Sequence, residues 1–355
     1  MRIDRFLYQK EKSFFAKILL FPFYLFSFPY GGLVRARSFL YTVGLKKVKR
    51  LPCPVMSVGN ITVGGTGKTP LVIALARGLM KRGIPVAILS RGYRGKKASG
   101  PLVSDGQKPL LSPEESGDEP FLMAKSLQGI PILVGKDRFI NGQMALQQFH
   151  IRGLLLDDGY QYLQLHRDLN ILLIDSQIGF GDDHLLPRGI LREPLVHLRR
   201  AHLFLLTKVD DPKACQPLEA KLHRIHPSSP VFHSHYEPSG LIGPNEEWEE
   251  IHSLRGKKVL ALSGIANPNY FSSLLKKYGA EITIALIFPD HYLYKPEDLA
   301  LLEKQGEGVD LFVTTEKDMV KLKVLNIRHL PIRALRIELK IWEEEEFYKK
   351  VLEIF

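Results

Sequence analysis

The sequence predicts an α/β fold in which a domain with a parallel sheet is followed by a second, smaller α/β domain. From residue 50 onward, short apolar runs alternate with segments whose apolar residues repeat at helical spacing. A polar, proline-bearing region at 210–255 interrupts this alternation before strand signals resume. Such alternation is typical of a parallel sheet with helices on both faces, whose ligands gather at the carboxyl ends of the strands.

The same runs give the expected domain boundaries. We expect an N-terminal segment at 1–45, a first domain at 46–215 and a second domain at 216–355, with a ribbon or linker near their junction. The runs "KVLALSGIANP", "EITIALIF" and "VDLFVTT" predict strands of the second domain. Candidate strands of the first domain are Val55–Val58, Val86–Ser90, Ile132–Val134, Leu154–Leu156, Ile171–Ile174 and Leu203–Leu206.

The N-terminal segment contains an uncharged stretch, "ILLFPFYLFSFPYGGLV", at 18–34. It is at the short limit for spanning a bilayer, and prolines and glycines interrupt it. Its Phe and Tyr residues favour the membrane interface, and basic residues flank it on both sides. We expect a membrane-associating helix that lies in the plane of the bilayer, with cations that meet anionic lipids. A buried helical hairpin is the alternative.

A glycine-rich loop, "NITVGGTGKTP" at 60–70, begins the first domain after a predicted strand and before a predicted helix. It matches the P-loop pattern except that Thr62 replaces the first glycine. Lys68 can reach the β- and γ-phosphates of a nucleotide, and the Thr69 hydroxyl can hold Mg²⁺. A turn with an incidental lysine is the alternative. We therefore expect a P-loop NTPase-like domain, with phosphate-binding residues Thr62, Val63, Gly64, Gly65, Thr66, Gly67, Lys68 and Thr69.

A second motif, "GLLLDDGYQ" at 153–161, places two carboxylates after a hydrophobic strand. In P-loop proteins an Asp at such a strand end holds Mg²⁺, directly or through water. We therefore predict that Asp157 and Asp158 are metal-binding residues. The alternative is a pair of solvated acids in a turn before Gly159.

Two further motifs carry groups suited to proton transfer. In "SGDEPFLMAK", Asp118 lies at a predicted helix start, where it could act as a general base. Equally, Ser116 and Glu119 could form a capping box. In "FPDHYLY", His291 follows a strand and could orient a carboxylate base. A helix-capping Asp290 beside a surface histidine is the alternative.

Charged loops suggest where phosphate groups bind. "LLPRGILREP" contains Arg188, Arg192 and Glu193, and "GKDR" contains Arg138 after a strand. Arginines in such loops suit bidentate phosphate binding, and solvated charge is the alternative. "LLTKVD" is a weak match to the NKxD element with which GTPases read guanine, because Thr207 replaces the Asn.

Composition restricts the class of partner. Among 355 residues, Lys and Arg number 49 against 38 Asp and Glu, a net charge of +11. This excess indicates an anionic partner, which could be nucleic acid, a membrane surface or a phosphorylated substrate. Cys53 and Cys215 form no CxxC pair, which excludes a zinc ribbon and is consistent with a reducing compartment.

Eight motifs occur together in a characteristic order: "SVGNITVGGTGKTP", "SRGYRG", "GDEP", "LLLDDGYQ", "LLPRGILREP", "SGIANP", "FPDHYLY" and "TTEKDMVKL". In this the chain resembles the tetraacyldisaccharide 4'-kinase (lipid A 4'-kinase) family of Gram-negative bacteria. The resemblance runs from the N-terminal stretch to about residue 322. It implies ATP- and Mg²⁺-dependent phosphorylation of the 4'-hydroxyl of a tetraacyldisaccharide 1-phosphate at the cytoplasmic face of the inner membrane.

The resemblance also implies roles for the candidate residues. Asp118 would be the base and His291 its partner, with Lys68 serving ATP as a third catalytic residue. Arg138, Arg192 and Glu193 match positions that line the family's active site. The implied partners are the lipid A disaccharide precursor and the inner-membrane lipid surface, without nucleic acid. The competing hypothesis is a membrane-docked P-loop GTPase or ATPase switch, which "TKVD" and the basic N-terminal segment would support.

Overall fold

The computed structural model describes residues 18–92 and 100–355, so residues 1–17 and the end of "SRGYRG" lie outside the described residues. The strands of this part are β1 (Val55–Gly59), β2 (Val86–Ser90), β3 (Leu102–Ser104), β4 (Ile132–Val134), β5 (Gly153–Asp157), β6 (Leu169–Asp175), β7 (Leu203–Thr207), β8 (Val231–Ile242), β9 (Trp248–Glu249), β10 (Lys258–Ser263), β11 (Glu281–Ile287), β12 (Leu311–Thr315) and β13 (Ile332–Ile341). The helices are α3 (Phe21–Thr42), α4 (Lys68–Lys81), α5 (Pro113–Ser116), α6 (Asp118–Ser126), α7 (Arg138–Gln148), α8 (Gln216–Ile225), α9 (Pro268–Lys277), α10 (Pro296–Gln305), α11 (Glu316–Leu322) and α12 (Glu344–Leu352).

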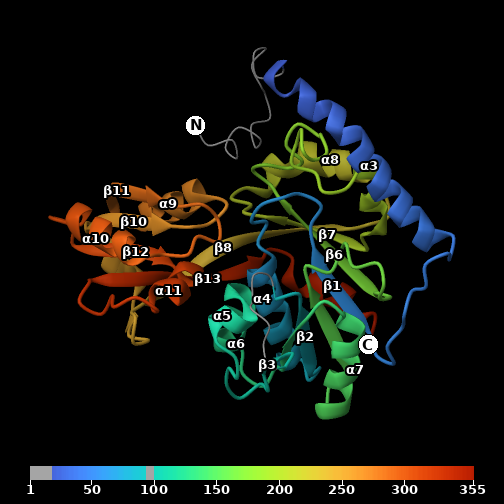
Figure 1. Cartoon of the computed structure of the whole chain (residues 1–355), viewed down its shortest axis with the longest axis horizontal. Helices are drawn as coiled ribbons and strands as arrows, with labels where there is room; N and C mark the ends of the chain where they lie inside the picture. Colours follow the sequence, from blue (N-terminus) through green and yellow to red (C-terminus); the bar gives the residue numbers. More distant parts are fainter. Residues whose placement is uncertain (1–17, 93–99) are drawn as a thin grey trace.

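Within the described residues, thirteen strands join in one sheet with the order β11-β10-β12-β13-β8-β7-β6-β1-β5-β2-β4-β3, and β9 pairs with β8 (Figure 1). We call β1 to β7 the first half and β10 to β13 the second half. Most neighbouring strands are parallel, and the exceptions are the β3–β4, β8–β9 and β8–β13 pairs. The predicted α/β fold class is therefore confirmed, and each candidate strand of the first domain is found.

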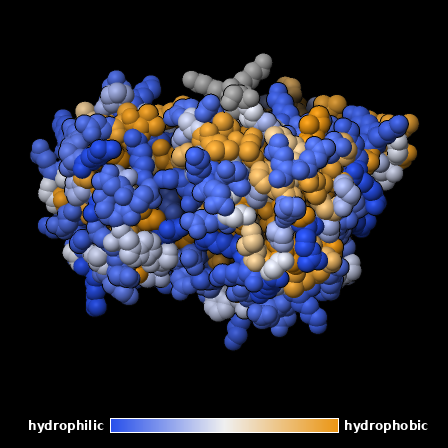
Figure 2. All heavy atoms as spheres, turned by 90° about the horizontal axis from the view of Figure 1, so that it is seen from below, coloured by the Kyte–Doolittle hydropathy of each residue, from blue (hydrophilic) through white to orange (hydrophobic). Residues whose placement is uncertain are grey.

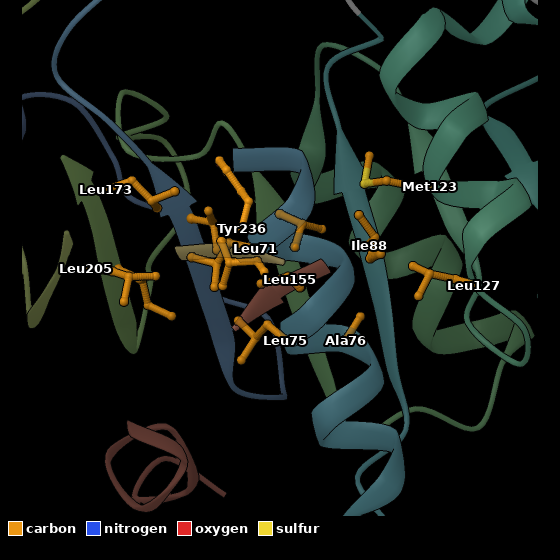
Figure 3. Close-up of a cluster of buried hydrophobic side chains, with 14 of the residues drawn as sticks. Leu71, Leu75, Ala76, Ile88, Met123, Leu127, Leu155, Leu173, Leu205 and Tyr236 are labelled. Atoms are coloured by element: carbon orange, nitrogen blue, oxygen red, sulfur yellow. The ribbon is translucent and has the colours of Figure 1, made fainter. Parts of the chain in front are cut away.

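Helix α4 forms the centre of the first half's core. Its apolar residues at helical spacing, such as Leu71 and Leu75, are fully buried and face the sheet (Figure 3). Leu155 of β5 and Leu173 of β6 pack against them in the same cluster. Burying one such side chain contributes about 1.5–3 kcal/mol, so these contacts hold α4, and the loop before it, on the sheet.

Strand β8 connects the two halves. Its first residues pair in parallel with β7, from Phe204 with Val231 to Leu206 with His233. Its later residues pair antiparallel with β13. The proline-bearing region at 210–255 contains β8 and β9, and the ribbon or linker expected there stays a prediction. The sheet runs through β8 without a break, and the domain boundary near residue 215 stays a prediction.

The end of the chain returns to the first half. Helix α12 packs on α4, where the Tyr348 hydroxyl donates a hydrogen bond to the Ala74 carbonyl at 3.1 Å. This approach requires glycine at position 78, because a Cβ there would lie 1.8 Å from the Tyr348 hydroxyl oxygen. The last residues of the predicted second domain thus contribute to the core of the first.

Helix α3 lies on the outside of the first half and docks on the loop at 184–192 (Figure 1). The Ser27 hydroxyl donates to the Leu185 carbonyl at 3.0 Å, and the Tyr30 hydroxyl donates to the Arg192 carbonyl at 2.8 Å. The opposite side of the helix is apolar and exposed, with Phe26 65% and Leu33 73% accessible. The alternative of a buried hairpin is therefore wrong. Among residues 18–92 and 100–355, no helix has the length and hydropathy needed to cross a bilayer.

A buried histidine joins α8, β8 and the turn before α12. His233 Nδ1 lies 2.8 Å from Glu343 Oε1, and Nε2 lies 2.9 Å from Glu219 Oε1. Burial acts to lower the pKa of His233, but the hydrogen bonds to Glu343 and Glu219 outweigh it and raise the pKa. A protonated imidazole can donate to both carboxylates at once, so this contact links three elements.

We expect His233→Leu to lower the free energy of unfolding by roughly 1–3 kcal/mol, since it leaves two carboxylates without their donor. Because the folded-state pKa is raised, this stabilisation is complete below about pH 6.5, the pKa of an unfolded-chain histidine, and is lost as the pH rises through the folded-state pKa. Urea unfolding at pH 6 and pH 9 measures the difference. His329→Leu, at an exposed contact with Glu303, is the control and should change little. An equal loss for His233→Leu at both pH values would contradict the charged-histidine account.

Candidate active site

A cavity of about 740 Å³ opens between the two halves. From the first half it is lined by the P-loop, the start of α6 and the end of β5, and from the second half by the loops after β10 and β11 and the start of α11. Figure 2, which views the molecule from below, shows hydrophilic side chains over most of the second half and around the hollow that separates it from the first. The cavity lies where the carboxyl ends of parallel strands meet, as the sequence predicts.

The loop between β1 and α4 has the conformation of a phosphate cradle. Gly64 and Gly67 have φ values of 106° and 92°, a region that favours glycine, and α4 begins at Lys68. Thr62 is not among the described residues with positive φ, so its replacement of the first glycine causes no strain. The Asn60 side chain donates to the Thr62 carbonyl and accepts from Lys68 Nζ at 3.2 Å, which holds the lysine toward the cavity.

Two residues of the "TKVD" element hold this loop from the side. The Thr207 hydroxyl donates to the Thr66 carbonyl at 2.9 Å, and Lys208 Nζ donates to the Gly65 carbonyl at 3.1 Å. Lys208 also pairs with the buried carboxylate of Asp175. From sequence this element was a weak guanine-recognition signal that a simple strand end also explains, and its support of the P-loop was missed.

The acidic pair lies at the end of β5, opposite the P-loop. Asp158 Oδ1 is 3.5 Å from Lys68 Nζ, and its Oδ2 is 3.5 Å from an Arg192 guanidinium nitrogen. Burial acts to raise the pKa of Asp158, but Lys68 and Arg192 outweigh it and lower the pKa. Asp157 accepts a hydrogen bond from the Ser90 hydroxyl at 2.8 Å. Its complete burial, with the nearby charges of Glu119 and Asp158, raises its pKa.

The oxygens at this position suit Mg²⁺. Asp157 Oδ1 is buried and has no hydrogen-bond partner in the described part of the chain, so it is available to a cation. Thr69 lines the same cavity. No group of three or more His, Cys, Asp or Glu that could hold a metal occurs in residues 18–92 and 100–355. Mg²⁺ needs no such group, because it is commonly held by one or two carboxylates, substrate phosphates and water.

The structure brings Asp118 and His291 together across the cavity. Asp118 Oδ2 lies 3.7 Å from His291 Nδ1, and both side chains are largely shielded from solvent. Burial acts to raise the pKa of Asp118, but His291 and the cations Lys321 and Lys317 outweigh it and lower the pKa. Asp118 is therefore a carboxylate at neutral pH, as a general base must be.

The structural alternatives for these two motifs are wrong. The capping box forms one turn earlier, between Ser112 and Glu115, and the N-cap of α6 is Gly117. Neither Asp118 nor Glu119 therefore belongs to the capping box, and both line the cavity. The helix after His291 is α10, whose N-cap residue is Lys295. The Asp298 carboxylate accepts from the Lys295 N–H, so Asp290 does not cap this helix.

The remaining candidates differ in position. Arg192 lines the cavity beside Asp158. Arg138 and Glu193 are not among its lining residues. Arg138 is buried and contributes to lowering the pKa of Asp158 through its charge. Glu193 is buried and accepts from the His197 ring, so it fixes the segment that carries Arg192.

Lys317 is a cavity residue that sequence reasoning did not single out. Its Nζ lies 3.2 Å from Glu119 Oε1 and 3.3 Å from Asp290 Oδ1. The sequence feature that could have identified Lys317 is the motif "TTEKDMVKL". Its first lysine follows a strand end, as the other site residues do.

A parallel sheet with a P-loop at one strand end, an acidic pair at the next and a carboxylate–histidine pair across a cavity defines a kinase of the P-loop class. Comparison with known proteins gives the family. Residues 16–355 match the family model for LpxK, described as Tetraacyldisaccharide-1-P 4'-kinase. The chain belongs to this family.

Relatives and a solved structure agree with that assignment. The chain is 41% identical to the tetraacyldisaccharide 4'-kinase of Syntrophus aciditrophicus over 361 residues, covering 98% of this chain and 95% of the relative. It is 42% identical to that of Geobacter sulfurreducens over 312 residues, covering 88% and 86%. The crystal structure of LpxK from Aquifex aeolicus in complex with ATP matches with a TM-score of 0.74 and 35% identity, covering 96% of this chain and 99% of that one.

Proposed function

We propose that this chain is an ATP-dependent lipid kinase that phosphorylates the 4'-hydroxyl of tetraacyldisaccharide 1-phosphate in lipid A biosynthesis. The family match over residues 16–355 carries this proposal. The cavity that places the P-loop opposite Asp118 agrees with it, because phosphoryl transfer needs a nucleotide and an acceptor hydroxyl in line.

The proposed mechanism assigns one task to each group. The P-loop amides and Lys68 bind the β- and γ-phosphates, and Arg192 offsets charge that develops on the transferred group. Asp118 accepts the proton of the sugar hydroxyl as this oxygen attacks the γ-phosphorus, and His291 orients Asp118. Asp157, Asp158 and Thr69 would hold Mg²⁺, which when bound neutralises phosphate charge. Closure of the two halves around both substrates would exclude water, the competing nucleophile.

The switch hypothesis has less support. Its supporting observations were "TKVD" and the basic N-terminal segment, and Lys208 of "TKVD" contacts Gly65 and Asp175 of its own chain. Relatives that match along most of the chain are named tetraacyldisaccharide 4'-kinase.

Product analysis tests the kinase directly. The full chain is incubated with ATP and tetraacyldisaccharide 1-phosphate in detergent micelles, and the lipid is examined by mass spectrometry and ³¹P NMR. We expect a lipid heavier by one phosphate, with the new phosphate on the 4' oxygen. Parallel reactions with GTP, and with ATP but no lipid, distinguish the switch. Nucleotide hydrolysis that lipid does not affect, without a bisphosphorylated product, would refute the proposal.

We further propose that the enzyme lies on the cytoplasmic face of the inner membrane, as a peripheral protein held by α3. The exposed side of α3 carries the large apolar residues Phe26, Phe28 and Leu33, which are 60–73% accessible. Its buried side contacts the loop that leads to Arg192. A surface helix with one side on the protein and the other apolar suits the interfacial region of a bilayer. A lipid substrate would then reach the cavity from the same membrane.

We expect Phe26→Glu with Leu33→Glu to weaken binding to phosphatidylethanolamine–phosphatidylglycerol vesicles by 10-fold or more, since each lost contact removes about 1.5–3 kcal/mol of apolar burial. Cosedimentation measures the binding. The matched control is Val324→Glu with Trp342→Glu, which alters two exposed apolar residues elsewhere on the surface. Equal weakening by both double variants, or by neither, would count against α3 as the anchor.

A further inference from the structure

Lys317 is the point at which the two halves meet beside the catalytic pair. It lies in the first turn of α11, which packs on α6 (Figure 1). Its Nζ contacts Glu119 of α6 at 3.2 Å, and Asp290 and His291 Nε2 of the loop after β11 at 3.3 and 3.2 Å. Only 17% of its side chain is exposed. One ammonium group therefore joins the helix that carries Asp118 to the loop that carries His291.

The chemistry of this contact limits the state of the imidazole. Burial acts to lower the pKa of Lys317, but Glu119 and Asp290 outweigh it and raise the pKa, so the amine is charged at neutral pH. An ammonium group donates hydrogen bonds and accepts none. At 3.2 Å it can only donate to Nε2, which must then carry a lone pair and no proton. The ring proton is left on Nδ1, the atom that faces Asp118.

We propose that Lys317 is a positioning residue that holds His291 as the neutral imidazole with its proton on Nδ1. His291 then directs this proton to one oxygen of Asp118 and leaves the other oxygen to the substrate. The inference deepens the proposed function and rests on it. It adds a residue, and a defined tautomer, to the Asp118–His291 pair.

The proposal fixes where the substrate proton goes. As the sugar oxygen bonds to the γ-phosphorus, the bond to the β-phosphate oxygen breaks and its electron pair leaves with ADP. The hydroxyl proton passes to Asp118, because Nδ1 of His291 is already protonated. The 3.7 Å between Nδ1 and Asp118 exceeds a hydrogen bond, and catalytic contacts of this kind commonly tighten only when substrate binds.

Removing the positive charge of Lys317 changes the balance of charged groups around the His291 ring. Asp118 and Glu119 from α6 and Asp290 from its own loop lie within 3.7–3.9 Å of the ring nitrogens. Lys317 is the α11 cation in contact with Glu119, Asp290 and the ring, whereas Lys321 of the same helix pairs with Asp318 and acts on Asp118 through its charge. Without Lys317, Nε2 loses the donor that holds its lone pair, and Asp118 loses a cation that lowers its pKa.

The tautomer can be observed by ¹⁵N NMR of the full chain labelled at the histidine ring nitrogens, with His291→Gln used to assign the signals. We expect the wild type at pH 7.5 to show neutral His291 protonated on Nδ1. Lys317→Met should convert the ring to the imidazolium or to the Nε2–H form, and Lys317→Arg should retain Nδ1–H. Lys323→Met is the matched control, because Lys323 follows α11 at its other end and pairs with Glu246, away from His291. An Nε2–H or charged ring in the wild type overturns the proposal, and so does an unchanged ring in Lys317→Met.

Kinetics give an independent readout. We expect Lys317→Met to lower kcat about 10- to 100-fold, with a small change in the KM for ATP, and to move the acid limb of the pH profile to higher pH. Lys323→Met should leave both unchanged. A loss of kcat in Lys317→Met with no movement of the acid limb would indicate a merely structural contact and overturn the proposal. The NMR measurement needs no lipid, so it separates failure of this inference from failure of the proposed function.

Discussion

Asp118→Asn should abolish most phosphoryl transfer while nucleotide binding persists. The amide has the shape of the carboxylate but cannot accept the hydroxyl proton, and removal of a general base typically costs 10²- to 10⁴-fold in rate. Asp118 lies 3.7 Å from His291 and its pKa is low, so the wild-type group is ready to accept a proton at neutral pH. Single-turnover measurement of lipid phosphorylation gives the rate, and calorimetric titration with ATP gives the affinity.

The neighbouring carboxylate supplies the control for this substitution. Glu119→Gln makes the same chemical change one residue along α6, in a side chain that contacts Lys317 rather than the proposed substrate position. It should reduce the rate much less than Asp118→Asn does. If Asp118→Asn instead lost ATP affinity and kept its rate constant at saturation, Asp118 would belong to the nucleotide site and the proposed base would have to be another group.

Lys68→Met should reduce both nucleotide binding and the transfer rate. The ammonium of Lys68 bonds to Asn60 Oδ1 at 3.2 Å and lies 3.5 Å from Asp158 Oδ1, so it is already aimed at the phosphate position. Loss of one preorganised group that stabilises transition-state charge commonly costs 10²- to 10³-fold in kcat. We expect at least that reduction in kcat/KM for ATP, measured with saturating lipid.

Lys221→Met is the control for Lys68→Met, because it also removes a lysine that has an acidic partner, but outside the cavity. Lys221 pairs with Asp183 and is not among the cavity-lining residues, so Lys221→Met should keep full activity. Thermal unfolding of both variants shows whether Lys68→Met merely unfolds the protein. A Lys68→Met enzyme with unchanged kcat/KM would mean that the glycine-rich loop does not hold the phosphates.

The first half and its nucleotide loop could be predicted from sequence because local signals determine them. A fully buried parallel strand such as β1 reads as a continuous apolar run, and Gly64 and Gly67 are needed where φ is positive. Asp157 and Asp158 follow such a strand directly. Their approach to the P-loop is a consequence of parallel pairing between β1 and β5.

The other part of the site depends on contacts between distant segments, which no local pattern encodes. Asp118 and His291 are separated by much of the chain and meet because β8 and β13 join the two halves. Capping rules predicted a capping box at Ser116, yet the box lies at Ser112, since the short helix α5 precedes α6. Lys317 was not singled out from sequence and Lys208 belonged only to a weak motif, because the partners that show what each lysine holds come from distant segments.

The fate of the γ-phosphate is the most direct test of the central claim. ATP labelled at the γ-phosphate is given to the full chain with tetraacyldisaccharide 1-phosphate in micelles, and the label is divided between lipid and free phosphate. We predict that the label enters the lipid in the wild type, and that Lys68→Met and Asp118→Asn each nearly eliminate this transfer. Label released as free phosphate at a rate that lipid does not change would contradict the account and favour a nucleotide-hydrolysing switch.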